Sequence, residues 1–162
     1  AREPQLEDFW RGIILFGRNV ASYKFALAKS LLEIQPRSGE LLRLEDLAPV
    51  YARHIVTHLK QVDRQGTFEN SHFLSACRAF IQGDLDDEQL RNAAMRYGFR
   101  HVIAAFHTID NTGKIVKPFF LDETRTGKGI RITNEFAELL ERDQAKNLPQ
   151  EVEARWRLVE TA

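Results

Sequence analysis

Two histidines placed four residues apart are the first candidates for chemistry in this sequence. They are His54 and His58 in the stretch HIVTH, and this spacing puts both imidazoles on one helix face, as in zinc proteases. Those enzymes need a glutamate directly after the first histidine as general base, and Ile55 stands there instead. No third ligand is evident, so we expect two half-exposed structural histidines, with a metal site on this helix as the alternative.

The stretch TGKG at residues 126–129 has some features of a phosphate-binding loop. Such a loop needs a glycine five residues before the Gly-Lys pair and a Ser or Thr after the lysine. Asp122 and Gly129 occupy these two positions. The stretch is therefore better explained as the tip of a hairpin.

A single cysteine and an acidic run are further candidates. Cys77 falls on the apolar side of a helical pattern, and because a nucleophilic cysteine needs exposure and a base, we expect it to pack in the core. The acidic run precedes another helical stretch, where carboxylates are favoured electrostatically. Helix capping explains this run without a metal; its members are Asp84, Asp86, Asp87 and Glu88.

Lys24 is in an unexpected place. In the helical pattern of residues 16–34 it falls on the same side as Leu27 and Leu31, near the helix start, where the dipole disfavours a cation. A buried unpaired ammonium is costly, so we expect an ion pair with an acid of another helix, or a head group that reaches water. The functional alternative is an opening that binds DNA phosphate or a neighbouring module, formed by Arg18, Tyr23, Lys24 and Lys29.

Helical periodicity accounts for most of the chain. Apolar residues recur at helical spacing over residues 6–16, 19–34, 46–62, 71–82, 86–98, 134–144 and 149–162. The residues expected to cap helices are Asn19, Asp46, Asp86 and Asn134. Residues 101–109 are predicted as a short helix or a strand.

The pattern becomes that of strands over residues 114–123 and 129–133, joined by TRTGK. We predict a β-hairpin whose tip uses unusual backbone angles at Gly127 and Gly129. Helices followed by a hairpin and another helix are in winged-helix order, so the second half is predicted to be winged-helix-like. The candidate phosphate contacts of this hairpin are Arg125, Lys128 and Arg131.

The helical stretch after Asp86 offers further candidate DNA contacts. Its first turn is acidic, which argues against docking that end on DNA. The candidates along the stretch are Arg91, Asn92, Arg96 and Arg100.

The composition is that of an ordinary globular domain. The 162 residues are 43% hydrophobic and 28% charged, with a formal net charge of zero, so a nucleic-acid surface requires local clustering of the basic residues. One cysteine excludes an internal disulfide and fits the cytoplasm, and no membrane span or signal peptide is visible. We predict one mainly α domain over 1–162, with sub-divisions 1–65, 70–145 and 148–162.

Several stretches together resemble the N-terminal part of a family of prokaryotic HNH endonuclease proteins. They are ILFGRNVASYKFALAKSLLE, LAPVYARHIVTHL, SHFLSACRAF, HVIAAFHTI, GIRITNEFAELL and NLPQEVEARWRLVETA. In that family such a region precedes the nuclease module, whose histidines surround one divalent metal such as Mg²⁺. None of the five histidines here sits in the hairpin-then-helix pattern of that module, so no catalytic residue is carried over.

The resemblance implies a noncatalytic N-terminal DNA-binding or regulatory domain of an HNH-type DNA endonuclease, in restriction or phage defence. Its partners would be DNA and the C-terminal HNH module, and the divalent metal would belong to that module; we expect no metal or cofactor in this chain. The ending RWRLVETA, in the middle of a helical pattern, is expected to continue in a longer protein. The alternative is a protein–protein interaction or homo-oligomerisation module that docks through the apolar stripe Val152, Trp156 and Val159.

Overall fold

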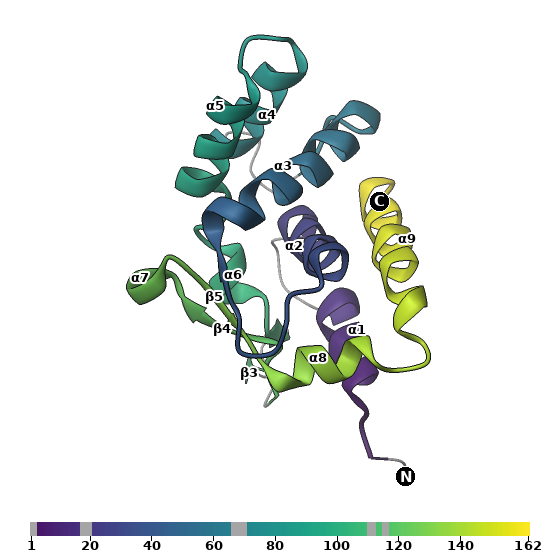
Figure 1. Cartoon of the computed structure of the whole chain (residues 1–162). Coiled ribbons are helices and arrows are strands. Elements are labelled where there is room, and N and C mark those ends of the chain that lie inside the picture. The colour runs from purple at the N-terminus through teal and green to yellow at the C-terminus, as the bar shows by residue number, and fades with distance from the viewer. Residues whose placement is uncertain (1–2, 17–20, 66–70, 110–112, 115–116) are drawn as a thin grey trace.

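Helix α9 (Leu148–Glu160), near the end of the chain, packs along α2 (Ala21–Ile34) and also touches α1 (Leu6–Phe16) (Figure 1). The computed structural model describes residues 3–16, 21–65, 71–109, 113–114 and 117–162. The predicted cap Asn19 lies outside these residues. The two ends of the chain therefore share one helical layer.

Helix α3 (Leu44–Gln61) lies between α2 on one side and α4 (His72–Ile81) and α5 (Asp87–Ala93) on the other (Figure 1). It begins earlier than predicted, so the assignment of Asp46 as its cap is wrong. Arg43 holds the N-cap position without a side-chain cap bond, and the Leu44 amide instead donates to the Lys128 carbonyl at 3.0 Å. The hairpin tip, at the residue between α7 and β5, thus replaces the missing cap, and Asp46 lies in the acidic first turn.

The start predicted for α5 is confirmed. The Asp86 side chain accepts a hydrogen bond from the Gln89 amide at 2.8 Å, and the Gln89 side chain accepts one from the Asp86 amide at 2.9 Å. This reciprocal pair is a capping box. A π-helical turn, η1 (Ala94–Gly98), and the short helix α6 (Val102–Ala105) follow.

A three-stranded antiparallel sheet joins distant parts of the chain. Its order is β1 (Leu41–Arg43), β5 (Gly129–Ile132), β4 (Phe120–Glu123), with Leu42 opposite Ile130 and Asp122 opposite Ile130 on the other side. A second, two-stranded sheet pairs β2 (Thr108–Ile109) with β3 (Gly113–Lys114).

The predicted hairpin exists as β4 and β5, but its first strand is shorter than predicted. It begins at Phe120, after Pro118, which cannot donate to a strand ladder. Lys114 belongs to β3 instead, and Ile115 and Val116 lie outside the described residues. Both alternatives for residues 101–109 occur, since α6 is followed by β2.

The hairpin tip is a helical turn, α7 (Thr124–Gly127). The left-handed backbone angle lies at Lys128, with φ 56°, so the expectation of unusual angles at Gly127 and Gly129 is wrong. Gly129 is needed for space: a Cβ there would lie 2.4 Å from the Leu42 carbonyl oxygen. Close approach of β1 excludes a side chain at this position.

After the sheet, α8 (Asn134–Leu140) and the 3₁₀ turn η2 (Ala145–Asn147) lead to α9. The predicted cap Asn134 is one residue late. The Thr133 hydroxyl accepts from the Phe136 amide at 3.4 Å and donates to the Pro118 carbonyl at 2.8 Å. Thr133 thus begins the helix and anchors it to the segment before β4.

The fold is the predicted mainly α domain with one small hairpin. Trp10 lies at the centre of an aromatic core, with ring centroids 5.3 to 6.0 Å from those of Phe106, Phe119 and Phe136. The hairpin resembles a wing, but its sheet takes β1 from the first half, and the helix before it, α6, is a single turn with two buried residues. Among the described helices, none has the length and apolar character needed to span a membrane.

Candidate functional site

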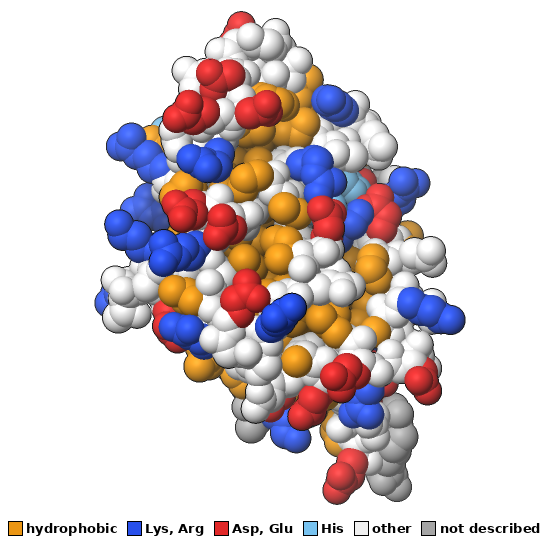
Figure 2. Space-filling model, viewed as in Figure 1, with side chains coloured by type: hydrophobic (Ala, Val, Ile, Leu, Met, Phe, Trp, Pro, Cys, Tyr) orange, Lys and Arg blue, Asp and Glu red, His pale blue; other side chains and the backbone are white. Residues whose placement is uncertain are grey.

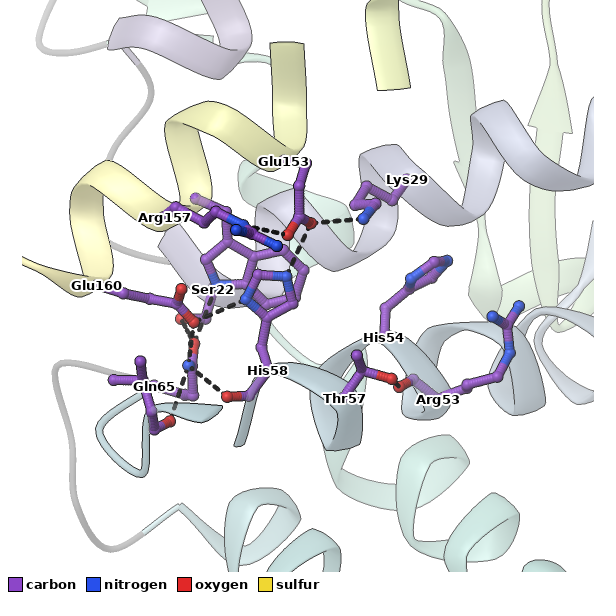
Figure 3. Close-up of polar contacts among 12 residues, drawn as sticks. Ser22, Lys29, Arg53, His54, Thr57, His58, Gln65, Glu153, Arg157 and Glu160 are labelled. Atoms are coloured by element: carbon purple, nitrogen blue, oxygen red, sulfur yellow. Dashed lines mark hydrogen bonds and ion pairs between the residues drawn. The ribbon is translucent and has the colours of Figure 1, made fainter. Parts of the chain in front are cut away.

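His58 is buried between two carboxylates of the last helix. It lies on α3 with 2% of its surface exposed. Its Nδ1 is 2.7 Å from Glu160 Oε2, and its Nε2 is 2.9 Å from Glu153 Oε1 (Figure 3). Ionised carboxylates only accept hydrogen bonds, so a ring nitrogen that carries a hydrogen can donate to the acid that it faces. The expectation of two half-exposed histidines is therefore wrong for His58.

Two further cations reach the same acid. Lys29 Nζ lies 2.6 Å from Glu153 Oε1, and Arg157 Nε lies 2.9 Å from Glu153 Oε2 (Figure 3). Burial raises the pKa of Glu153, but hydrogen bonds from Lys29, Arg157 and His58 outweigh it and lower that pKa to about 2. Glu153 is thus held ionised at the meeting point of α2, α3 and α9.

Gln65 completes the arrangement from the segment after α3. Its Oε1 accepts hydrogen bonds from the Ser22 hydroxyl at 2.8 Å and from Trp156 Nε1 at 2.9 Å, and its Nε2 donates to Glu160. The Trp156 ring stacks on His58 with centroids 3.4 Å apart and an interplanar angle of 4°. We call this group the His58 cluster; its members are Ser22, Lys29, His58, Gln65, Glu153, Trp156, Arg157 and Glu160.

The His58 cluster is a structural connection rather than an active site. A histidine held by a carboxylate is a common general-base arrangement, but no reactant can reach a ring that is covered by Trp156 and nearly fully buried. Trp156 and Val152 are fully buried within the chain, and Val159 is partly buried. The expectation that these three residues form a free docking stripe is therefore wrong.

His54 lies one turn before His58 with a different environment. Burial, together with the charges of Lys29 and Arg53, lowers its pKa to about 4. Its Nε2 is 3.2 Å from Glu33 Oε1 but is not aligned for a hydrogen bond. Within the described part of the chain, no group of His, Cys, Asp or Glu residues is arranged to hold a metal ion.

The residues expected to form a DNA-binding opening on α2 are not gathered on one exposed surface. Tyr23 is 2.5 Å from the Ser71 hydroxyl and packs against Phe73. Lys29 belongs to the His58 cluster, and Lys24 is only 2% exposed. Arg18 lies outside the described residues.

Lys24 lacks one of the two expected solutions. Within the described residues no acid forms an ion pair or hydrogen bond with it, and the residue is 2% exposed. Burial, followed by the positive charge of Arg155, lowers its pKa to about 8. Cys77 is also buried, as predicted, and burial raises the pKa of its thiol to about 12.

Two of the three candidate cations of the hairpin have no ion-pair partner among the residues that the structure describes. Arg125 and Lys128 are exposed. Arg131 instead makes two hydrogen bonds to Glu123, each 3.0 Å long, and a third to the Gly39 carbonyl. The third cation therefore stabilises the sheet.

Five basic side chains lie on α5, on the residues that follow it and at this tip. They have no acidic partner within the described residues and are exposed. Figure 2 shows Lys and Arg side chains gathered along the edge that carries α5 and α7 in Figure 1. We call this set the basic flank: Arg91, Arg96, Arg100, Arg125 and Lys128.

Sequence reasoning missed most of the His58 cluster. Glu153 and Glu160 stand seven residues apart, which places them on one helix face, and this spacing was the available signal. Ser22 and Gln65 carry no such signal, because only the fold brings them beside Trp156.

No family model, curated protein or solved structure matches this chain. The function must therefore be argued from the chain's own residues.

Proposed function

We propose that this chain is a noncatalytic domain that binds the DNA backbone and positions DNA for, or regulates, an HNH-type nuclease module. The observation that carries DNA binding is the basic flank, whose exposed cations have no acidic partners among the described residues. The HNH connection rests on the sequence resemblance alone. Restriction or phage defence is the corresponding biological role.

Unpaired cations are what a phosphate-binding surface requires. Elsewhere Arg11, Lys29 and Arg157 are neutralised by acids of α9, so their charges are not free for a ligand. The basic flank contains guanidinium groups and a lysine at the hairpin tip. A guanidinium group can bind phosphate oxygens through two parallel hydrogen bonds. Because the net charge of the chain is zero, DNA would be attracted by this local cluster.

The acidic start of α5 sets the orientation of the proposed complex. Asp86, Asp87 and Glu88 lie at the N-terminal end of the helix, whereas Arg96 and Arg100 follow its C-terminal end. DNA would therefore contact the C-terminal end and the hairpin tip, and be repelled from the other end.

The test is the salt dependence of binding to a short labelled DNA duplex, measured by fluorescence anisotropy. Each phosphate contact contributes about 0.9 to the slope of log K against log salt, so the double variant Arg125→Gln/Lys128→Gln should lower the slope by about 1.8. Lys146→Gln, at an exposed lysine on η2, is the matched control and should change little. An unchanged slope in the double variant, or binding insensitive to salt, would contradict the proposal.

The second candidate function is a protein-interaction module. A groove of about 730 Å³ lies between α3 and α5, with Val56, Phe80 and Leu90 among its apolar lining, and Figure 2 shows hydrophobic side chains between these helices. The HNH module or a second copy of the chain would dock there. This candidate would be favoured if light scattering showed concentration-dependent association of the chain, if Phe80→Ser abolished that association, and if the chain did not bind DNA.

A further inference from the structure

Tyr97 is an exposed aromatic ring among the cations of the basic flank. It lies on the π-helical turn η1 and is 36% exposed. The guanidinium carbon of Arg96 lies 5.2 Å from the centre of the Tyr97 ring, and Arg100 follows three residues later in the chain. The basic flank therefore combines positive charge with an aromatic surface.

A second ring extends this aromatic surface. His72, the first residue of α4, is exposed and stacks on Tyr97, with ring centroids 5.0 Å apart and an interplanar angle of 28°. Met95, on the same turn as Tyr97, is 37% exposed. The surface beside Arg96 is thus aromatic and apolar as well as charged.

The backbone of η1 is held firmly by the core. The buried Tyr51 hydroxyl donates a hydrogen bond of 2.8 Å to the Gly98 carbonyl, and a Cβ on Gly98 would lie 3.2 Å from the Tyr51 ring. The buried residues of this turn are its two ends, Ala94 and Gly98, so the three side chains between them face solvent. Because the turn is fixed, little conformational entropy is lost when Tyr97 binds a ligand.

We propose that these rings stack unpaired bases of single-stranded DNA whose phosphates lie on the basic flank. We call the stacking surface the Tyr97 platform; its members are His72, Arg96 and Tyr97. Single-stranded DNA is bound by cations that follow its backbone and by aromatic side chains on which its bases stack. A base inside a duplex has both faces covered by its neighbours, so only an unpaired base can use the platform. The inference rests on the proposed DNA-binding function, because the basic flank must hold the phosphates.

Arg96 has two roles in this arrangement. It is exposed and lies against the Tyr97 ring in the free chain. A guanidinium group can stack on a base or bind a phosphate, so Arg96 can leave the Tyr97 ring to an incoming base and still contact the strand.

The test measures binding of the intact chain to three labelled ligands of equal length by fluorescence anisotropy. They are a strand of thymidines, the same strand with abasic residues in place of the bases, and a duplex. The first two ligands carry the same phosphates, so the difference between them measures the contribution of the bases. We expect the thymidine strand to bind about tenfold more tightly than the abasic strand.

Three variants assign this difference to the Tyr97 ring. Tyr97→Leu keeps an apolar side chain but removes the ring, and should weaken binding of the thymidine strand by about tenfold while leaving the abasic strand and the duplex unchanged. Tyr97→Phe keeps the ring and should bind as wild type. Phe16→Leu is the matched control, because Phe16 is an aromatic residue of α1, 63% exposed and outside the basic flank, and it should also bind as wild type.

Failure of this inference differs from failure of the proposed function. Equal affinity for the thymidine and abasic strands, or unchanged binding of the thymidine strand in Tyr97→Leu, would overturn the Tyr97 platform even if the duplex binds through the basic flank. If none of the three ligands shows salt-dependent binding, both the platform and the proposed DNA-binding function are overturned.

Discussion

Replacing Glu153 with glutamine removes one negative charge from the His58 cluster and leaves the side-chain shape almost unchanged. In the folded chain this carboxylate balances Lys29 and Arg157 and lies 2.9 Å from His58 Nε2. After Glu153→Gln, Lys29 and Arg157 would lie near one another with only a neutral amide between them. We expect lower stability, because removing one partner of a largely buried ion pair leaves the other charges uncompensated.

The magnitude follows from the pKa of Glu153. A pKa of about 2 in the folded chain, against an ordinary 4.5, corresponds to about 1.4 kcal/mol for each unit of difference. A quarter of the Glu153 side chain is exposed, so solvent screens part of the interaction. We therefore expect Glu153→Gln to lower the free energy of unfolding by about 2 kcal/mol at neutral pH.

The sign of the pH dependence is fixed by the direction of the shift. The pKa of Glu153 is lower in the folded state, so its stabilisation is fully present above pH 4.5 and is lost as the pH falls toward about 2. The difference between wild type and Glu153→Gln should thus shrink by more than half between neutral pH and about pH 3.

Urea unfolding followed by tryptophan fluorescence measures both quantities. Glu151→Gln is the matched control, because Glu151 lies on the same helix and pairs with Arg11 at 2.8 Å, but its side chain is 40% exposed. Such an exposed pair contributes at most about 1 kcal/mol. The reasoning fails if the two variants are equally stable at pH 7, or if the Glu153→Gln difference is the same at pH 3.

Three further predictions test other parts of the fold. Gly129→Ala should lower the free energy of unfolding by about 1–3 kcal/mol in chemical denaturation, because its Cβ would clash with the Leu42 carbonyl. Gly127→Ala should lower it less, because its Cβ would meet a flexible Leu41 side chain at 3.0 Å. Equal losses in the two variants would refute the close-approach argument. Asp86→Ala should lower the free energy of unfolding by about 1 kcal/mol, because the capping box is lost, whereas Asp87→Ala should lower it less. A larger loss in Asp87→Ala than in Asp86→Ala would count against that cap. Cys77 should resist a thiol reagent at pH 8 in the native chain and react fully in denaturant, because burial raises its pKa to about 12; fast native labelling would contradict its burial.

Local features of the fold were predictable from the sequence. The capping box at Asp86 and the hairpin of β4 and β5 depend on residues close together in the chain, so their patterns are visible in a short window. The start of α3 was not predictable, because its first amide is satisfied by Lys128 at the tip of a hairpin that is distant in the sequence. A cap supplied by tertiary structure leaves no nearby sequence signal.

The chemical groups were harder to place than the elements. Helical periodicity put Cys77 on a buried face, but it also suggested half-exposed histidines, since it says nothing about what covers a face. His58 is buried because α9 returns across α3 with Trp156, Glu153 and Glu160. Lys24 was correctly placed on the apolar side of α2, and its lack of a described acidic partner became apparent only in three dimensions.

The position of β5 in the middle of its sheet has a kinetic consequence. It pairs with β4 across a short tip, but its other neighbour, β1, comes from the first half of the chain. The hairpin can form early, whereas Leu42 and Ile130 meet only after a long loop closes, and such closure slows folding. We infer that docking of β1 is a late step, so mutations in β1 would mainly accelerate unfolding rather than slow folding.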